Sequence, residues 1–169
     1  MKSRFLPLLV ASLALSTLAL SGCSALDRLV SDNLPRPAET RDADSGEIVG
    51  GGKTDVFTLR VGDCLDDSTT AEQVSDVTTV PCGEAHDYEV YADFPVPDGE
   101  YPADMQDIAD QGCYDRFQAF VGVAYEDSTL DFSNYTPTED GWTELDDRLV
   151  TCLIFDEGKV QGSLAGAAR

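Results

Sequence analysis

Basic side chains are scarce in this chain of 169 residues, and histidine is scarcer still. Eleven lysines and arginines stand against 32 acidic residues, which gives a formal net charge of −21 with the single histidine neutral. A surface of this sign repels nucleic-acid phosphates and anionic lipid headgroups, so the composition argues against a nucleic-acid partner. It is compatible with a basic partner, with weak binding of divalent cations, or with a solvated acidic surface.

The chain also lacks the motifs of common catalytic and metal sites. It has no Gly-x-Ser-x-Gly motif of serine hydrolases and no Cys-x-x-Cys pair of zinc ribbons. The Gly50-Gly51-Gly52-Lys53-Thr54 stretch has Glu47 where a P-loop needs its first glycine, so these glycines are expected to supply flexibility. The acidic stretch 42–47 resembles the start of a calcium loop, but its glycine comes one position early. We therefore predict no catalytic residues, no metal site and no cofactor.

The first 23 residues have the order of a bacterial lipoprotein signal. A short basic start precedes a mostly apolar run from Phe5 to Leu20, which is short for a transmembrane helix. Leu20-Ser21-Gly22-Cys23 then matches a lipobox, in which small residues admit a peptidase and the Cys23 thiol accepts a diacylglyceryl group. The alternative is an ordinary signal peptide with an incidental cysteine. The sequence predicts a protein anchored by a lipid on Cys23 to the extracytoplasmic face of the cell membrane.

Cleavage of this signal before Cys23 would define the mature chain. Removing residues 1–22 deletes Lys2 and Arg4 and no acid, so the net charge of −21 becomes −23 and 147 of the 169 residues remain. Residues 23–54 contain prolines, glycines and scattered charges with little apolar periodicity, which predicts a lipidated N-terminus and a flexible tether. Residues 55–165 are predicted to form one folded domain.

Four cysteines remain once Cys23 is assigned to the lipid, and an even number in an oxidising compartment predicts two disulfides. Cys113 lies on the apolar stripe of a predicted helix, and Cys152 lies on the core face of a predicted strand. A helix packed on that strand would bring the two sulfurs together. Cys64 and Cys82, each after the end of a predicted strand, are paired mainly by elimination. A zinc site is the alternative, but its ligand spacing is poor.

Periodicity and turn residues predict an α+β fold with an antiparallel sheet of about four to six strands and one main packed helix. Between residues 87 and 94, Tyr88, Val90, Ala92 and Phe94 are expected on one face of a strand. The tail from Gly162 is expected to fray. The helix is predicted at residues 102–121 and ends at Gly122; strands are predicted at 56–61, 74–80, 87–94 and 149–155, a short strand or irregular segment at 130–135, and a loop at 137–141.

His86 is the one side chain suited to proton transfer near neutral pH without a large pKa shift. Together with Asp87 and Trp142 it forms a candidate loop or binding cluster. A structural role, with His86 bonded to backbone or to Asp87, is favoured over a catalytic or metal-binding role. Tyr101, Tyr125, Tyr135 and Trp142 lie in or near predicted loops, where they could line a contact surface or pack against the core.

Several of these residues together resemble the septum formation domain family of high-GC Gram-positive bacteria. The resemblance covers about residues 55–165 and implies an envelope location and a role connected with septum formation, with no catalytic residue to carry over. The family often has a glycine where this chain has Asp146, a departure that concerns a turn. The matching residues are Val61-Gly62-Asp63-Cys64, Val80-Pro81-Cys82, His86 to Val90, Cys113 with Phe117, Tyr135-x-Pro137, Trp142, Asp147-Arg148 and Val150-Thr151-Cys152.

Taken together, these observations predict a non-enzymatic lipoprotein of the cell envelope that binds a protein or a cell-wall component. A lipoprotein that binds a small ligand or a cation is the alternative, and a compact pocket lined by tyrosine and tryptophan would favour it. A cell-wall hydrolase is less favoured, because the chain has one histidine and no nucleophile motif.

Overall fold

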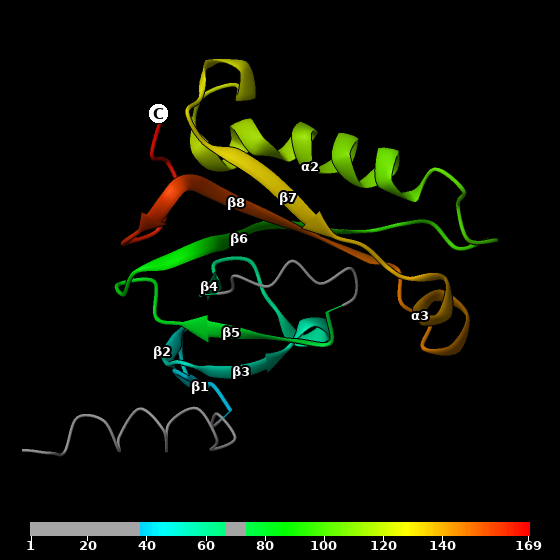
Figure 1. The fold of residues 1–169 in the computed structure, drawn as a ribbon, viewed down its shortest axis with the longest axis horizontal. Coiled ribbons are helices and arrows are strands. Elements are labelled where there is room, and N and C mark those ends of the chain that lie inside the picture. Colours follow the sequence, from blue (N-terminus) through cyan, green and yellow to red (C-terminus); the bar gives the residue numbers. More distant parts are fainter. Residues whose placement is uncertain (1–37, 67–73) are drawn as a thin grey trace, which may run out of the picture. The chain divides into compact units, whose positions relative to one another are not determined.

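The structure is a computed structural model that describes residues 38–66 and 74–169 (Figure 1). The predicted signal, the lipobox with Cys23 and the first part of the predicted tether lie outside the described residues. Among the residues that are described, no helix is both long enough and apolar enough to span a membrane.

The described chain is built around a six-stranded antiparallel sheet with the strand order β3-β5-β4-β6-β8-β7. The long strands β6 and β8 pair with each other at its centre, and helix α2 lies along one face of β6, β7 and β8 (Figure 1). The predicted α+β fold with one main helix is confirmed. The elements are β3 (Gly52–Asp55), β4 (Cys64–Leu65), β5 (Asp76–Val80), β6 (His86–Pro95), α2 (Met105–Val121), β7 (Asp131–Tyr135) and β8 (Leu149–Val160).

The fold begins earlier in the chain than the sequence predicted. A hairpin of β1 (Thr40–Arg41) and β2 (Ile48–Gly50) precedes β3, and β3 pairs with β5. Residues 40–54 are therefore structured, and the expectation of a flexible tether up to residue 54 is wrong for this part. The strands escaped prediction because each is only two to four residues long and is stabilised by pairing with other segments.

Two features of this segment that resemble binding motifs have structural roles. The Asp42 carboxylate closes the hairpin turn by accepting hydrogen bonds from the Ser45 N–H at 2.8 Å and the Ser45 hydroxyl at 3.1 Å. These bonds, with the backbone bond first, lower the pKa of Asp42. At Gly51, a Cβ atom would lie 2.8 Å from the Thr79 carbonyl oxygen. Close packing on β5, and not the flexibility predicted, therefore accounts for glycine at this position.

The β-branched run at residues 56–61 is not the strand that was predicted. Val56–Thr58 form a 3₁₀ turn, η1. The Asp55 carboxylate accepts a hydrogen bond from the Phe57 N–H at 2.9 Å, and the Thr58 hydroxyl donates to the Asp55 carbonyl at 2.8 Å. Such local bonds compete with strand pairing, and they leave the Phe57 side chain at the surface.

Strand β6 contains the predicted segment 87–94, but its facing pattern changes halfway. The pairing with β8 shifts register between Val90 and Ala92, so Tyr91 and Ala92 both belong to the core beneath α2. The prediction that Ala92 and Phe94 share a face with Tyr88 and Val90 is therefore wrong. An inserted residue in one strand of a pair moves all following side chains to the other face.

Helix α2 begins at Met105, three residues later than the predicted start at Pro102, and ends as predicted before Gly122. Gly122 has a φ of 96°, the left-handed conformation of a helix C-cap. The residues that the helix buries recur at every fourth position and form the predicted stripe. They are Met105, Ala109, Cys113, Phe117 and Val121.

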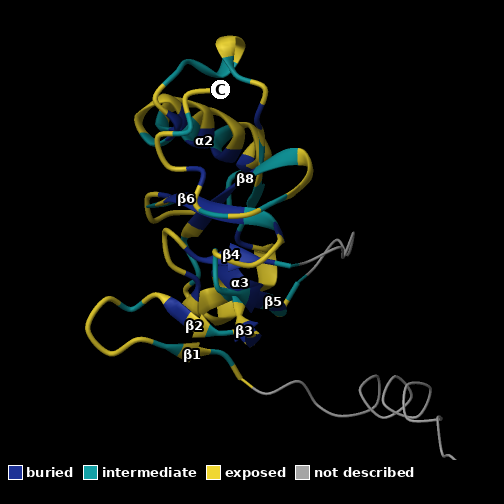
Figure 2. Ribbon diagram, turned by 90° about the vertical axis from the view of Figure 1, so that its left-hand side faces the viewer, coloured by how far each residue is buried: buried dark blue, intermediate teal, exposed yellow. Residues whose placement is uncertain are grey.

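Two separate apolar cores lie on the two faces of the sheet. The larger core lies beneath α2 and includes Phe117, Trp142 and Ile154. The smaller core lies on the opposite face and consists of Leu59, Leu65, Val77, Val90 and Leu153. Figure 2 shows buried residues, in dark blue, along the strands and on the inner side of α2, while exposed residues cover the outer helix surface.

Both predicted disulfides are confirmed. Cys113 of α2 is bonded to Cys152 of β8, with Cα atoms 5.5 Å apart. Cys64 at the start of β4 is bonded to Cys82, which follows β5, with Cα atoms 5.2 Å apart. The first bond joins the helix to the sheet, and the second joins two neighbouring segments of the sheet.

The C-terminal third contains more regular structure than predicted. Residues 131–135 form strand β7, and Glu139–Glu144 form a short helix, α3, where a loop was expected. The tail after Gly162 is not frayed. The Leu164 side chain is buried, and its N–H donates to the Glu89 carboxylate at 2.6 Å. Further backbone bonds join the tail to the end of α2, including Ala168 N–H to the Val121 carbonyl at 2.9 Å.

Candidate functional site

A cleft of about 800 Å³ lies on the sheet face opposite α2. Six segments distant in sequence line it: η1, residues 74–75, the first part of β6, the end of β7, α3 with the turn that follows, and the first part of β8. Gln106 of α2 also reaches its edge. The strands supply the floor because the register of β8 directs Thr151 and Leu153 to this face and Cys152 and Ile154 to the helix.

The floor of the cleft is continuous with the smaller core. Leu153 is buried, and Tyr88 and Tyr135 pack against the same group of apolar side chains. The Tyr88 ring meets the Phe155 ring edge to face, with centroids 5.3 Å apart. Two aromatic rings and an aliphatic side chain thus form a rigid apolar base.

Large apolar side chains on the walls of the cleft are exposed to solvent. Phe57 of η1 has 54% of its surface exposed, Leu145 after α3 has 66%, and Leu149 at the start of β8 has 36%. Exposed apolar groups gathered around a hollow are typical of surfaces that bind a partner. These three side chains contribute little to the core and are available for contact.

Three carboxylates accompany the apolar walls. Asp140 and Glu144 lie four residues apart on α3, and Asp147 follows in the next turn. The described lining contains no lysine, arginine or histidine to balance them. The potential in the cleft is therefore negative, in a chain that is strongly acidic overall.

Local capping and aromatic packing position α3. The Thr138 hydroxyl is the N-cap and accepts a hydrogen bond from the Gly141 N–H at 2.9 Å. Trp142 of α3 is buried, and its ring meets the Tyr101 ring edge to face, with centroids 5.8 Å apart. The Trp142 indole N–H donates to the Gly99 carbonyl at 3.0 Å. The buried indole thus fixes the helix that carries the acidic wall.

Arg148 completes the support of this wall. Its guanidinium lies 3.8 Å from the centroid of the Trp142 ring and forms ion pairs with Asp98 at 3.1 Å and Asp146 at 2.9 Å. Asp146 has a φ of 56°, in the left-handed region. Glycine adopts this conformation more readily than a residue with a Cβ atom.

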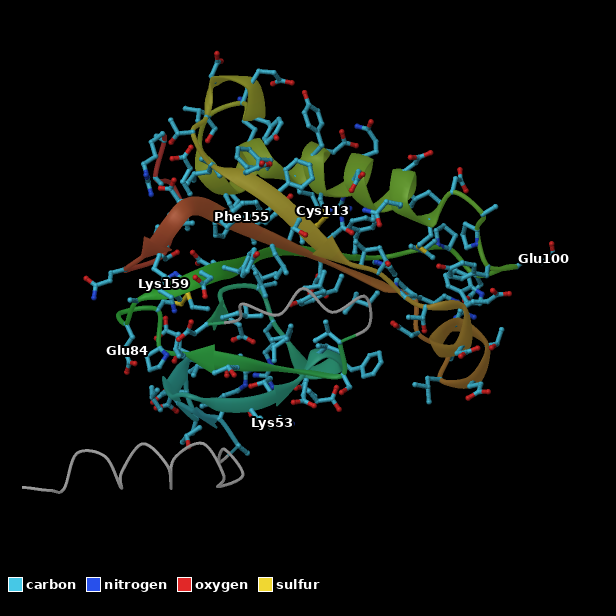
Figure 3. The ribbon with its side chains drawn as sticks, in the orientation of Figure 1. Lys53, Glu84, Glu100, Cys113, Phe155 and Lys159 are labelled. Atoms are coloured by element: carbon cyan, nitrogen blue, oxygen red, sulfur yellow. A yellow bond between two sulfur atoms is a disulfide. The ribbon has the colours of Figure 1, made fainter. Side chains whose placement is uncertain are left out.

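The structure does not bring the predicted cluster of His86, Asp87 and Trp142 together. His86 pairs with Val160 at one end of the sheet, whereas Trp142 bonds Gly99 beyond the other end of β6. Figure 3 shows the separation: Glu84 and Lys159, near His86 in sequence and pairing, lie far from Glu100, near Gly99. None of the three residues lines the cleft.

His86, at the start of β6, is fully buried. Its Nδ1 lies 2.9 Å from the Glu84 carbonyl oxygen, so a bond to backbone holds the loop before β6. Its Nε2 is also buried and has no hydrogen-bond partner among the described residues. Asp87 points elsewhere: its carboxylate lies 3.5 Å from the Lys159 ammonium, and burial, followed by the bond with Asp66, raises the pKa of Asp87.

A second hollow, of about 620 Å³, lies beside the Cys64–Cys82 disulfide. Its buried acids are already bonded within the protein. Glu89 accepts from the Ser163 hydroxyl and from the tail backbone, both at 2.6 Å. Cys64, Cys82 and Glu89 place potential metal-ligand atoms within 4.8 Å of one another. Because the two sulfurs are joined in a disulfide, they are not the thiolates that bind metals.

The side chains that line the cleft limit the chemistry available to it. Neither histidine nor cysteine is present in its described lining, so a Ser–His or Cys–His nucleophile pair is not formed there. Apolar side chains, hydroxyls and carboxylates are arranged around an open hollow. This set is suited to contact with apolar groups that lie next to a positive charge.

Of the aromatic residues proposed as contact residues from the sequence, only Tyr135 lines the cleft. Trp142 of α3 packs against Tyr101, and Tyr125 belongs to an aromatic group with Phe117 and Phe132. Sequence reasoning missed the wall residues Phe57, Leu145 and Leu149. The one available signal was Leu145 itself, a large apolar residue within an acidic turn.

Comparison with known families identifies one match. A family model described as septum formation matches residues 61–168. Searches of curated proteins and of solved structures find no match. The matched range contains every segment that lines the cleft except η1, and it contains all four disulfide cysteines.

Proposed function

Since the chain belongs to the septum formation family, which indicates a role related to the septum, we propose that it is a non-enzymatic module that binds a protein partner in the cell envelope. The cleft opposite α2 is the binding site in this proposal. The observation that carries it is the exposure of Phe57 and Leu145, on two separate segments that line one hollow with an apolar floor.

A protein partner fits the cleft better than a small ligand. Small-ligand sites enclose most of the ligand surface, whereas Leu145 stands 66% exposed on the wall. Trp142, the tryptophan that a compact pocket would use, is buried on α3 against Tyr101 and does not line the cleft. Aliphatic and aromatic side chains at an open surface are typical of the centre of a protein interface.

The lipid anchor belongs to the same proposal. Leu20-Ser21-Gly22-Cys23 has the spacing of a lipobox, and the folded part of the chain begins by Thr40. A lipid on Cys23 would attach the module to the membrane through the residues that precede the hairpin. The module would then act close to the extracytoplasmic face of the cell membrane. Intact-mass measurement of membrane-extracted protein should show diacylglycerol on Cys23, and a mature protein without Cys23 would refute the anchor.

The function is tested by removing the apolar walls of the cleft in cells that make this protein. Phe57→Ser with Leu145→Ser should give misplaced or delayed septa by microscopy, with the protein present at its normal level. The control is Val49→Ser with Val61→Ser, because these side chains are 57% and 50% exposed but lie outside the cleft. Normal septa in the cleft variant, or equal defects in both variants, would contradict the proposal.

A further inference from the structure

The charges around the cleft indicate what kind of partner surface it accepts. Most basic side chains in the described part of the chain are paired with acids outside the cleft: Arg41 with Asp63, Lys53 with Asp76, Arg148 with Asp98 and Asp146, Lys159 with Asp66 and Asp87, and Arg169 with Asp156. Within the described residues, the carboxylates of Asp140 and Glu144 have neither an ion pair nor a hydrogen bond. They are therefore free to pair with an incoming cation.

The two carboxylates lie beside the exposed apolar wall. Residues four positions apart share one side of a helix, so Asp140 and Glu144 form an acidic edge on α3. Leu145 follows directly, and the apolar floor of Tyr88, Tyr135 and Leu153 lies in the same hollow. An occupant that matches this surface presents apolar side chains to the floor and walls and positive charges to α3.

On this basis we infer that the cleft binds a basic, apolar peptide segment of its partner, in which lysine or arginine residues stand next to leucine-like or aromatic residues. The inference rests on the proposed function and adds the chemistry of the partner. A lipid surface is a poorer match, because a chain with a net charge of −21 is repelled by anionic headgroups. A peptide supplies apolar anchors and cations in one flexible segment that can follow an open cleft.

The experiment uses the full-length chain and three labelled twelve-residue peptides. The first alternates leucine and lysine, the second alternates leucine and glutamate, and the third alternates serine and lysine. Fluorescence anisotropy should detect binding of the leucine–lysine peptide only, and the affinity should fall as salt rises from low to physiological concentration, because exposed charges are screened.

Matched variants separate the cleft from the acidic surface in general. Asp140→Asn with Glu144→Gln should weaken binding roughly tenfold, as expected for the loss of two exposed charge pairs of about 0.7 kcal/mol each. Asp127→Asn with Glu157→Gln removes the same charge from exposed positions outside the cleft and should leave binding unchanged. Melting curves of all variants verify that they are folded.

Several outcomes would overturn the inference. Equal weakening by both double variants would show that the peptide binds the acidic surface in general. Binding of the leucine–glutamate peptide with similar affinity would show that the cleft does not require positive charge. Similar binding of the serine–lysine peptide would show that it does not require apolar side chains. A dimer that is seen by light scattering and lost in Leu145→Ser would identify a second copy of the chain as the occupant.

The failure of this inference differs from the failure of the proposed function. If no peptide binds but Phe57→Ser with Leu145→Ser still disturbs the septum, the cleft binds a partner of other chemistry. If those substitutions leave septa normal, the proposed function itself is wrong, whatever the peptides do.

Discussion

The two faces of the sheet use the same strands but are built differently. On the α2 face, fourteen buried apolar residues form one core, within which a disulfide joins α2 to β8. On the opposite face, five buried residues form a smaller core that is continuous with the floor of an open cleft. The helix face is closed by the chain's own side chains, whereas the cleft face leaves Phe57 and Leu145 in water.

This difference shows where the stability of the fold resides, and it separates that region from the proposed binding face. Burial of apolar surface and cross-linking stabilise the helix face. Exposed apolar side chains on the cleft face contribute little to folding, and the proposed contact with a partner would account for their exposure. The comparison predicts that substitutions on the helix face change the free energy of unfolding, and that substitutions on the cleft walls change binding alone.

The largest expected effect is the loss of the disulfide on the helix face. Cys113→Ser with Cys152→Ser opens a loop with a sequence separation of 39 residues and should lower the free energy of unfolding by about 4 kcal/mol. Cys64→Ser with Cys82→Ser opens a separation of 18 and should cost about 3 kcal/mol. Urea unfolding at fixed pH measures both. A greater loss for the Cys64–Cys82 pair would break the comparison.

The next effect concerns the contact between α2 and β6. A Cβ atom at Gly112 would lie 2.1 Å from the Phe94 ring, so the helix needs glycine there to approach the strand. Gly112→Ala should destabilise the protein by about 1–3 kcal/mol through overpacking, although the same change in an open helix position stabilises by up to about 1 kcal/mol.

Thermal melting of Gly112→Ala is compared with that of Gln118→Ala, at an exposed position of the same helix. Adding Phe94→Leu to Gly112→Ala should recover part of the loss, because it removes ring atoms that the new methyl group would meet. An unchanged or higher melting temperature for Gly112→Ala alone would mean that the helix face is less tightly packed than described.

A smaller effect is expected at the turn after α3. Asp146→Ala should cost about 1 kcal/mol, because alanine is disfavoured at a φ of 56°. Asp146→Gly should melt at or above the parent temperature, since glycine adopts this conformation freely and the exposed ion pair with Arg148 contributes little. Calorimetry decides, and a glycine variant less stable than the alanine variant would show that the ion pair outweighs the backbone conformation.

The smallest effect is expected on the cleft wall, and it tests most directly whether the two faces of the sheet differ in their contribution to stability. Leu145→Ala should change the free energy of unfolding by less than about 0.5 kcal/mol, because most of the side chain is already in water. The same substitution at Leu164, which is 4% exposed, should cost about 2–5 kcal/mol. Similar losses at both positions, measured in urea, would mean that the cleft wall supports the fold.

Apolar periodicity in the sequence predicted the main helix and its buried face, which depend on residues close together in the chain. The spacing of Cys113 and Phe117 on an apolar stripe indicated the helix and the face of the disulfide, because periodicity reflects burial directly. The hairpin before β3 was missed because its strands are short and its stability comes from partners distant in sequence. The residue run 56–61 was misassigned because the capping side chain of Asp55 outweighs β propensity.

The cleft could not be predicted because no motif encodes it. Its walls come from residues 57, 145 and 149, and its floor comes from strands that meet only after the sheet has formed. The predicted cluster failed for the same reason: Asp87 and Trp142 lie towards opposite ends of the sheet. Which residues face a hollow follows from register, and one bulge at Val90 to Ala92 is enough to invert an alternating pattern.

The contact between the hairpin and the sheet has a mechanical consequence. Arg41 of β1 donates to both carboxylate oxygens of Asp63, at 2.7 and 2.8 Å, and the backbone of Asp63 accepts a hydrogen bond from the Val90 N–H at 2.8 Å. Tension applied from the N-terminal side is therefore transmitted from Arg41 to the central strand β6 as well as to the terminal strand β3. Because Cys64 follows Asp63 and is cross-linked to Cys82, this path ends on a covalent bond. A load applied through the proposed lipid anchor would therefore act on an end of the domain that resists unravelling.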